Sequence, residues 1–359
     1  MLIKKLTDAC GLPGFEKEVR DIIKAELEGH VDSMTTDRLG NLIVVKNANN
    51  NEVGVANAGA AGAANTKGAA GARGRHIVLC AHMDEVGLCI RSIDKDGYLS
   101  FASWGVDARV LYTKSVLVGK DRIPGVIGAA PIHLLPPEQR SVPVPVEKLY
   151  IDIGARSKED AESCVSPGDY AAFAGDYVEF GDNKIKAKAL DDRIGCAAII
   201  EVLKSGVKNK VTAIFSAQEE TGLRGAAAAA NRVCADFAIV IEGTVCADTV
   251  GEDERQVTVQ GHGPVISVMD RTTIYLKKHV DSVIAVAKAR NIPYQFRRTG
   301  AGGTDAGSIH IAKGGTPCVG ISAPCRYIHS PVSVVDKRDY ENLVKLLKAY
   351  LEEDIANEC

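Results

Sequence analysis

Histidine and carboxylate side chains follow several short apolar segments of this 359-residue chain. The apolar segments are rich in Val, Ile and Ala and predict buried strands at residues 76–81, 211–217, 237–241 and 316–322. The polar side chains that come after them are His82, Asp84, Glu219, Glu220, Glu242 and His329, and a further pair, Asp191 and Asp192, precedes a helical pattern. Ligands bind beyond the strand ends of an open α/β sheet. We therefore expect these stretches to meet at one edge of a sheet and to form one metal site.

Two pairs of these residues have spacings that suit a metal site. Asp84 lies two residues after His82, so both side chains would point to one face of a strand. The Asp84 carboxylate could then hold the second ring nitrogen of a metal-bound His82, although a structural His–Asp pair without metal is the alternative. Of the adjacent Asp191 and Asp192, one could bridge two cations while the other caps the following helix. The alternative is that both only cap it.

The remaining candidates complete a set of two histidines and three carboxylates. Glu219 and Glu220 can face different directions, so that one binds metal and the other carries a proton, unless both lie in a solvated turn. Glu242 follows four apolar residues and would need a cation as partner if it is buried rather than exposed. His329 lies in a loop just past the last predicted strand. This set fits two cations that share one bridging carboxylate.

The composition excludes some classes of protein and some classes of binding partner. The chain has 43 Lys and Arg against 46 Asp and Glu, so its net charge of -3 favours neither nucleic acid nor an anionic membrane as a partner. Its 10 cysteines are scattered and contain no C-x-x-C pair, which argues against a disulfide framework. The beginning of the chain lacks the apolar part of a secretory signal, and no stretch approaches the roughly 20 apolar residues of a membrane span. We expect a globular, cytoplasmic protein.

The rest of the pattern predicts an α/β fold with an insertion. A helical pattern ends at Gly29, and the turn at residues 38–41 predicts a hairpin. Residues 47–75 are rich in Asn, Ala and Gly and predict a low-complexity surface insertion. Short strand-like pieces at 90–184 predict a small β-rich domain. It divides a catalytic domain, residues 1–89 and 185–359, in which alternating strands and helices predict a mixed sheet flanked by helices.

Five stretches carry a resemblance to a known family. They are HMDEVG from His82, LDDR from Leu190, QEETGLRG from Gln218, GGTDAG from Gly302 and HSP from His329. In order and spacing they resemble the M42 family of dinuclear metallo-aminopeptidases. That family includes glutamyl aminopeptidases, tetrahedral aminopeptidases and members labelled cellulase M or endoglucanase. The resemblance implies a zinc-peptidase-like catalytic domain.

The resemblance also implies a role for each candidate residue. Asp191 would bridge two divalent ions, which His82 with Glu242 and Glu220 with His329 would complete. Zinc, cobalt and manganese all suit such ligands. Glu219 would be the general base, and Asp84 would hold the His82 ring. Many relatives carry Asp where this chain has Glu242, so the longer arm must reach the metal here.

Assembly and activity follow from the same resemblance. The inserted β-rich domain would form dimers, and the dimers would assemble into a hollow tetrahedral dodecamer. The expected activity is hydrolytic release of the N-terminal residue from peptides with a free amine, by water bridging the two metals, with Glu219 taking its proton. Arg326 or Arg298 could give a cationic pocket for an acidic residue, but the preferred residue stays open.

Three alternatives to this activity remain. One is a dinuclear deacylase or carboxypeptidase that acts on N-acylated amino acids. Another is a glycoside hydrolase, since two carboxylates suffice for that chemistry. Aromatic content of 5% and a single Trp disfavour it, because sugars stack on aromatic rings. The last is a non-catalytic shell, which the presence of Glu219 beside all proposed ligands disfavours.

Overall fold

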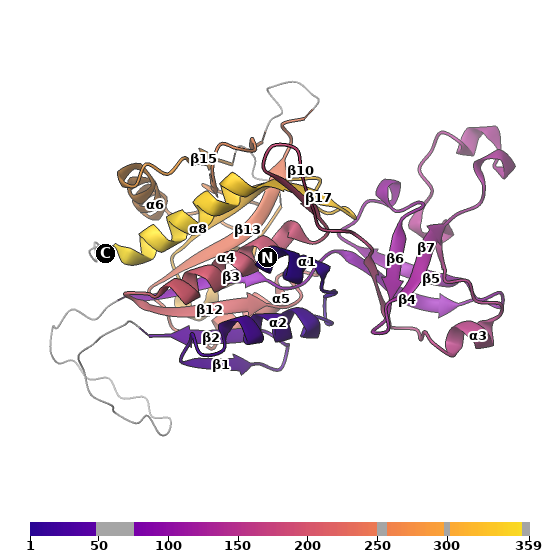
Figure 1. Cartoon of the computed structure of the whole chain (residues 1–359), viewed down its shortest axis with the longest axis horizontal. Coiled ribbons are helices and arrows are strands. Elements are labelled where there is room, and N and C mark those ends of the chain that lie inside the picture. Colours follow the sequence, from indigo (N-terminus) through magenta and orange to yellow (C-terminus); the bar gives the residue numbers. More distant parts are fainter. Residues whose placement is uncertain (48–74, 250–256, 298–301, 354–359) are drawn as a thin grey trace.

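The computed structural model describes residues 1–47, 75–249, 257–297 and 302–353. The predicted surface insertion at 47–75 therefore lies, apart from its two end residues, outside the described residues. Within the described parts the chain folds into a helix-covered mixed sheet and a small barrel that projects from one side of it (Figure 1). The α/β class predicted from the sequence is confirmed at this level.

The large sheet has a parallel centre. Its order is β1-β2-β12-β3-β13-β16-β17-β11-β10, and β12, β3, β13 and β16 run parallel to one another. The strands are β1 (Ser33–Thr36), β2 (Leu42–Lys46), β3 (His76–His82), β10 (Val178–Phe180), β11 (Lys184–Ala187), β12 (Lys210–Ser216), β13 (Phe237–Cys246), β16 (Cys318–Arg326) and β17 (Ser333–Asp336). Two further short strands, β14 (Val265–Ile266) and β15 (Gln295–Phe296), lie off this path. The central strands are buried because helices cover both faces of a parallel sheet.

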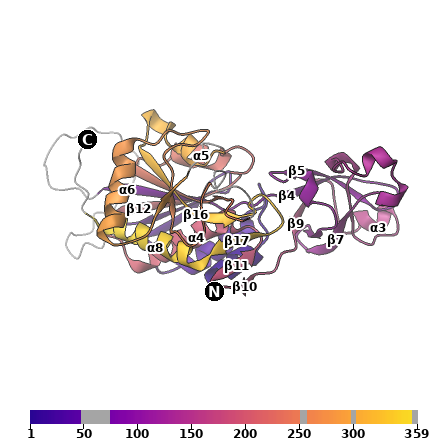
Figure 2. The ribbon, with the colours of Figure 1, turned by 90° about the horizontal axis from the view of Figure 1, so that it is seen from above.

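Helices α4 and α8 pack on one face of the sheet, and α5 and α7 pack on the other (Figure 2). The main helices are α1 (Leu2–Asp8), α2 (Lys17–Leu27), α4 (Leu190–Ser205), α5 (Arg224–Ala230), α6 (Lys277–Ala289), α7 (Ala306–Ile309) and α8 (Lys337–Glu352). α4 is buried along most of its length, and α8 buries one stripe that includes Leu343 and Leu347. That stripe is the amphipathic pattern of a helix lying on a core. None of the described helices is long and apolar enough to cross a membrane.

The inserted unit is a closed barrel with its own apolar core. Its strand order is β4-β5-β8-β7-β6-β9. The elements are β4 (Gly87–Ile93), β5 (Leu99–Trp104), β6 (Ser115–Val118), β7 (Ile123–Gly128), β8 (Tyr150–Asp152), α3 (Lys158–Glu162) and β9 (Tyr170–Phe173). The predicted boundaries of 90 and 184 differ from this, because the barrel strands run from 87 to 173 and β10 pairs with β11 in the large sheet. All three residues of β10 are exposed, so its sequence carries no pattern that assigns it to either sheet.

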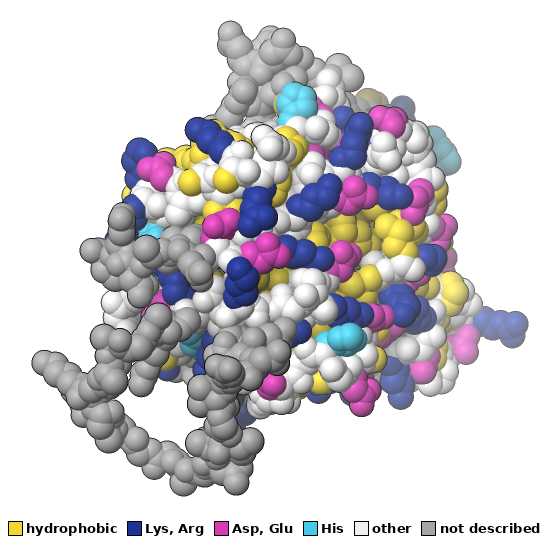
Figure 3. Space-filling model, turned by 60° about the vertical axis from the view of Figure 1, so that its left-hand side comes forward, with side chains coloured by type: hydrophobic (Ala, Val, Ile, Leu, Met, Phe, Trp, Pro, Cys, Tyr) yellow, Lys and Arg dark blue, Asp and Glu magenta, His cyan; other side chains and the backbone are white. Residues whose placement is uncertain are grey.

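Charges of both signs are mixed on the surface. Figure 3 shows one face, on which Lys and Arg side chains lie among Asp and Glu side chains. This face therefore has no extended field of a single sign that would attract a polyanion.

A buried ion cluster joins the N-terminal segment to the two loops that precede β4 and α4. The Glu85 carboxylate accepts hydrogen bonds from Lys188 Nζ at 2.7 and 2.8 Å, from the Gly11 amide at 3.0 Å and from Arg193 at 3.2 Å. Arg193 also donates to the Met83 carbonyl at 2.9 Å. The three charged side chains are at most 4% exposed, so each depends on the others for solvation.

Replacement of Glu85 by Ala is expected to lower the free energy of unfolding by about 3–5 kcal/mol, because two buried cations lose their partner. Glu162→Ala is the matched control, since Glu162 forms a half-exposed pair with Lys158 at 3.6 Å. Such a surface pair contributes about 0–1 kcal/mol. Urea unfolding midpoints of the two variants measure the difference, and equal midpoints would contradict the structural role of the cluster.

Candidate metal centre

The predicted candidate ligands come together where the parallel strands end. His82 is the last residue of β3, Glu219 and Glu220 follow β12, and His329 lies in the loop between β16 and β17. Glu242 does not end its strand, as the sequence suggested, because β13 continues to Cys246. Pairing of β13 with β3 stops at Val240, however, so Glu242 stands where that edge of β13 opens toward the site.

Asp191 lies between the two histidines. Its Oδ1 is 3.6 Å from His82 Nε2, and its Oδ2 is 3.9 Å from His329 Nε2. The Glu242 carboxylate lies 3.4 Å from His82 Nε2, and the Glu220 carboxylate lies 3.8 Å from His329 Nε2. Two carboxylates thus surround each histidine nitrogen.

These spacings fit metal ligands better than hydrogen bonds. Distances of 3.4–3.9 Å exceed the roughly 2.7–3.2 Å of a good N–H···O bond. Two ligands that each lie about 2.1 Å from a tetrahedral ion must be about 3.4 Å apart. Within the described parts of the chain, two groups of residues have ligand atoms close enough together to share an ion: His82, Asp191 and Glu220, and His82, Asp192 and Glu242.

Burial disfavours the charged form of these carboxylates, and a bound cation would offset that cost. Desolvation raises the pKa of Glu220 and that of Glu242 to about 7, and it raises the pKa of Glu219 and Asp192 as well. Glu242 Oε1 and Asp192 Oδ2 are buried and have no hydrogen-bond partner among the described residues. Unpaired buried carboxylate oxygens cost free energy unless a cation or donor meets them. The residues present therefore fit divalent metal ions.

The Asp84 carboxylate is placed differently from the prediction. Its Oδ1 is 3.7 Å from His82 Nδ1, which is too far for a hydrogen bond. The acceptor for the ring is instead the backbone carbonyl of Asp84, at 3.1 Å from His82 Nδ1. The chain turns after β3, so the backbone rather than the side chain comes beneath the ring. His82 is still held with its Nε2 toward Asp191.

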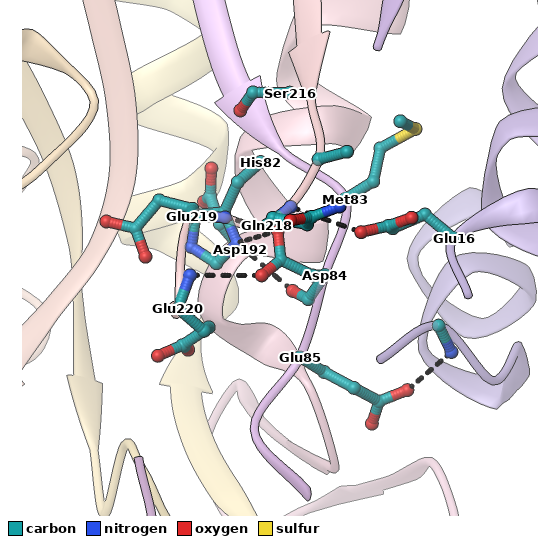
Figure 4. Close-up of polar contacts among 12 residues, drawn as sticks. Glu16, His82, Met83, Asp84, Glu85, Asp192, Ser216, Gln218, Glu219 and Glu220 are labelled. Atoms are coloured by element: carbon teal, nitrogen blue, oxygen red, sulfur yellow. Dashed lines mark hydrogen bonds and ion pairs between the residues drawn. The ribbon is translucent and has the colours of Figure 1, made fainter. Parts of the chain in front are cut away.

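The carboxylate of Asp84 holds the turn that carries both glutamates (Figure 4). It accepts hydrogen bonds from the Glu219 and Glu220 amides, each at 3.0 Å. The preceding amide, that of Gln218, donates to Glu16 at 3.1 Å. Three successive amides are thus fixed by carboxylates from two distant segments. Glu16 was not singled out from the sequence, because nothing near it in the chain indicates a contact with β12.

Two further buried acids, Asp192 and Asp305, adjoin the site and are not part of the predicted set of metal ligands. Asp192 accepts a hydrogen bond from the Gly195 amide at 3.0 Å, which agrees with the predicted capping, but its carboxylate also lies close to His82 and Glu242. Asp305 is fully buried, bonds Ser216 Oγ and lies 3.5 Å from Cys80 Sγ. The GGTDAG stretch that contains Asp305 was the signal that could have indicated it.

A cavity of about 520 Å³ opens beside the cluster. The residues that line it include five of the predicted site residues, His82, Asp191, Glu219, Glu242 and His329, together with Gly243, Thr244, Val245, Val257, Arg297, Gly302, Gly303, Thr304 and Ile328. Arg326, one of the two predicted cationic candidates, does not line it, since its guanidinium pairs with Asp248 at 2.6 and 2.9 Å. The other, Arg298, lies outside the described residues. Among the described residues, Arg297 brings a cationic side chain to the lining of the cavity, and it was not predicted to do so.

The metal-free protein should lose stability as the pH rises. Burial raises the pKa of Glu220 and Glu242 from the usual 4.5 to about 7. Between these values the folded carboxyls keep protons that the unfolded chain has released, so the free energy of unfolding falls with pH. We expect a lower melting temperature at pH 8 than at pH 5, and a smaller difference once metal is bound. Thermal unfolding of dialysed and metal-loaded protein tests this, and a metal-free protein more stable at pH 8 would contradict it.

Sequence comparison identifies relatives along nearly the full length. A family model described as M42 glutamyl aminopeptidase matches residues 62–346. A protein of Acetivibrio thermocellus named "Putative aminopeptidase" is 39% identical, over 96% of each chain. The lysyl aminopeptidase of Pyrococcus furiosus is 31% identical over 98% of this chain and 96% of its own. The glutamyl aminopeptidase of Lactococcus lactis is 30% identical, over 97% and 94%.

Solved structures of related peptidases are also similar to this chain along nearly its full length. The TET aminopeptidase of a marine sediment archaeon of the Thaumarchaeota has a TM-score of 0.88 and 33% identity, covering 98% of this chain and 96% of its own. The TET1 peptidase of Pyrococcus horikoshii, described as able to assemble into a tetrahedron or a large octahedral shell, has a TM-score of 0.82 and 33% identity, over 98% and 100%. With a family match over most of its length, the chain belongs to the M42 family of aminopeptidases.

Proposed function

We propose that this chain is a dinuclear metallo-aminopeptidase that releases the N-terminal residue from peptides with a free α-amine. The observation that carries the proposal is the position of Asp191, whose two oxygens lie toward different histidines, His82 and His329. His82 with Glu242 would hold one ion, Glu220 with His329 would hold the other, and Asp191 would bridge them. Zinc, cobalt and manganese all suit these ligands.

The side chains around the ions would supply proton transfer and orientation. Bound divalent ions lower the pKa of water and polarise a carbonyl group. Glu219 lines the cavity, and a carboxylate there that is not held as a ligand can accept a proton as a general base. Glu219 would take a proton from the attacking water and return it to the leaving amine. Asp84 would keep Glu219 in position through the backbone of its turn.

The carboxylates that line the cavity favour a substrate with a charged amine at the cleaved end. Asp191, Glu219 and Glu242 all reach this cavity, so an ammonium group would find acceptors there. An N-acylated end would lack that charge. This difference separates an aminopeptidase from a deacylase built on the same two metals.

A substrate panel tests the proposal. Aminoacyl-p-nitroanilides with acidic, basic and apolar residues would be assayed beside their N-acetylated forms, after chelator treatment and reconstitution with each metal. We expect turnover of the free-amine substrates only, and only with metal restored. Release of acetate from the N-acetylated forms would support the deacylase, and chelator-resistant hydrolysis of cellulose would support the glycoside hydrolase. The same panel measures whether the enzyme prefers substrates with an acidic N-terminal residue, as Arg297 at the cavity wall would favour.

Assembly and location complete the proposal. Relatives that assemble into shells support a homo-oligomer, and we propose dimers that build a dodecamer. Exposed apolar side chains on the inserted barrel, among them Ile132, Leu134 and Val142, would then be covered by a second copy. The nine described cysteines are all free, which supports a reducing cytoplasm.

A further inference from the structure

We propose that the inserted barrel supplies part of the catalytic centre, because the backbone carbonyl of Gly105 orients the ring of His329. His329 Nδ1 lies 3.0 Å from the Gly105 oxygen. Gly105 directly follows Trp104, the last residue of barrel strand β5, whereas His329 belongs to the loop after β16 in the large sheet. The contact therefore joins the two structural units at the site, and Gly105 is a positioning residue. The inference rests on the proposed metal role of His329.

The direction of this hydrogen bond decides which ring nitrogen is available. The Gly105 carbonyl can only accept, so Nδ1 of His329 carries the proton. The Nε2 lone pair is then left to face the Glu220 and Asp191 carboxylates, at 3.8 and 3.9 Å. A metal-binding histidine needs this arrangement, in which the second nitrogen is fixed by an acceptor.

Packing alone does not hold the ring. The His329 side chain is 46% exposed, compared with 2% for His82. Among the described residues, hydrogen bonding to the His329 ring is confined to the Gly105 carbonyl. The backbone of His329 is itself in the left-handed region, with φ of 57°. A half-exposed ring on such a loop depends on its one acceptor for a defined orientation.

The chain around Gly105 is built to bring its backbone this close. Its φ of +67° is one that residues with a side chain rarely adopt. A Cβ atom placed there would lie 2.6 Å from Val86 Cγ1, and 3.2 Å from both Glu220 Oε2 and His329 Nδ1. Two candidate metal ligands thus border the space that a side chain would enter. Glycine is required both by the turn and by the site.

The route of the chain explains how the barrel reaches the site. β4 begins at Gly87, only five positions after His82, and Gly87 pairs with Trp104 of β5. The β4–β5 hairpin therefore begins next to the site, close to His82, and ends next to it, close to His329. The first two barrel strands tie the positions of His82 and His329 together, so the barrel contributes to catalysis as well as to any contact between subunits.

Gly105→Ala tests this inference, with Gly154→Ala as the matched control. Gly154 lies in the same inserted unit and has a φ of +76°, but a Cβ atom there meets nothing within 4 Å. Both variants carry comparable backbone strain, and only the first disturbs His329. Zinc and cobalt would be titrated into the chelator-stripped full-length proteins, with ion content measured by elemental analysis. We expect the ion held by Glu220 and His329 to bind about 10–100-fold more weakly to Gly105→Ala. Loss of other groups that orient metal-binding histidines has an effect of this size. Gly154→Ala should bind like the unmodified protein.

A double variant separates the effect on the site from a failure to fold. Val86→Ala removes the closest clash and leaves the contacts with His329 and Glu220 in place. Gly105→Ala/Val86→Ala should therefore fold and still bind the ion at Glu220 and His329 more weakly. Val86→Ala alone should bind both ions normally. Normal affinity for both ions in the double variant would overturn the role of Gly105. If the unmodified protein binds fewer than two ions, the dinuclear proposal fails, and the inference fails with it.

Discussion

Replacement of Glu219 by Gln is expected to lower kcat by a factor of about 100 or more while leaving the metal content unchanged. Glu219 lines the cavity, yet none of the close distances to the two histidines that define the candidate ligand set involves it. The amide keeps the shape of the side chain and removes only its ability to accept a proton. Steady-state kinetics on an aminoacyl-p-nitroanilide and elemental analysis of the same samples provide the two measurements.

The control for this variant is Glu201→Gln. Glu201 lies on α4, accepts a hydrogen bond from Tyr340 at 2.7 Å and does not line the cavity. It should retain nearly full activity. If Glu219→Gln retained it as well, Glu219 would not be the general base. If that variant lost its metal instead, Glu219 would have to be counted among the ligands.

Asp191→Ala is expected to abolish tight binding of both ions and, with it, activity. Asp191 lies 3.6 Å from His82 and 3.9 Å from His329, so its removal would withdraw a proposed ligand from each ion. Removal of Glu242 or Glu220, by contrast, should weaken mainly one ion. Metal content per subunit, measured after dialysis against metal-free buffer, distinguishes these outcomes.

Asp182→Ala serves as the control for Asp191→Ala. Asp182 is 79% exposed and lies on the turn between β10 and β11, where it pairs with Arg338 at 3.3 Å. That variant should keep two ions. Two ions per subunit in Asp191→Ala would contradict a bridging role and would require another arrangement, for example one in which Asp192 ligates an ion.

Strong local patterns predicted much of the fold. The apolar segments at 76–81 and 211–217 became β3 and β12 with bounds shifted by one residue, because a short buried strand between polar turns has few alternatives. The hairpin at 38–41 formed between β1 and β2 as expected. Strand β10 was assigned to the wrong unit, since three exposed residues do not specify a partner strand.

The candidate site was predicted in its residue types but not in its supporting contacts. The candidate ligands stand next to strongly apolar segments, so local sequence was enough to locate them. The roles of Glu16 and Gly105 depend on segments that meet only in the folded chain. The Asp84 side chain was predicted to accept a hydrogen bond from the His82 ring. In the structure the Asp84 backbone carbonyl accepts that bond, and the side chain accepts one from the Glu219 amide instead. A backbone carbonyl such as that of Asp84 is present in every residue type, so the sequence at position 84 gives no sign of this contact.

The order of strands in the large sheet has a consequence for synthesis of the chain. β3 lies between β12 and β13, but residues 83–209 separate β3 from β12 in sequence. The barrel lies entirely within that interval, so we expect it to fold on the ribosome before β3 acquires either neighbour. Until residues 210–246 emerge, β3 exposes unpaired backbone N–H and C=O groups along both edges to other nascent chains, while the barrel, being closed, exposes no such edge. Early folding of the barrel therefore adds no further exposed strand edges while the large sheet is still incomplete.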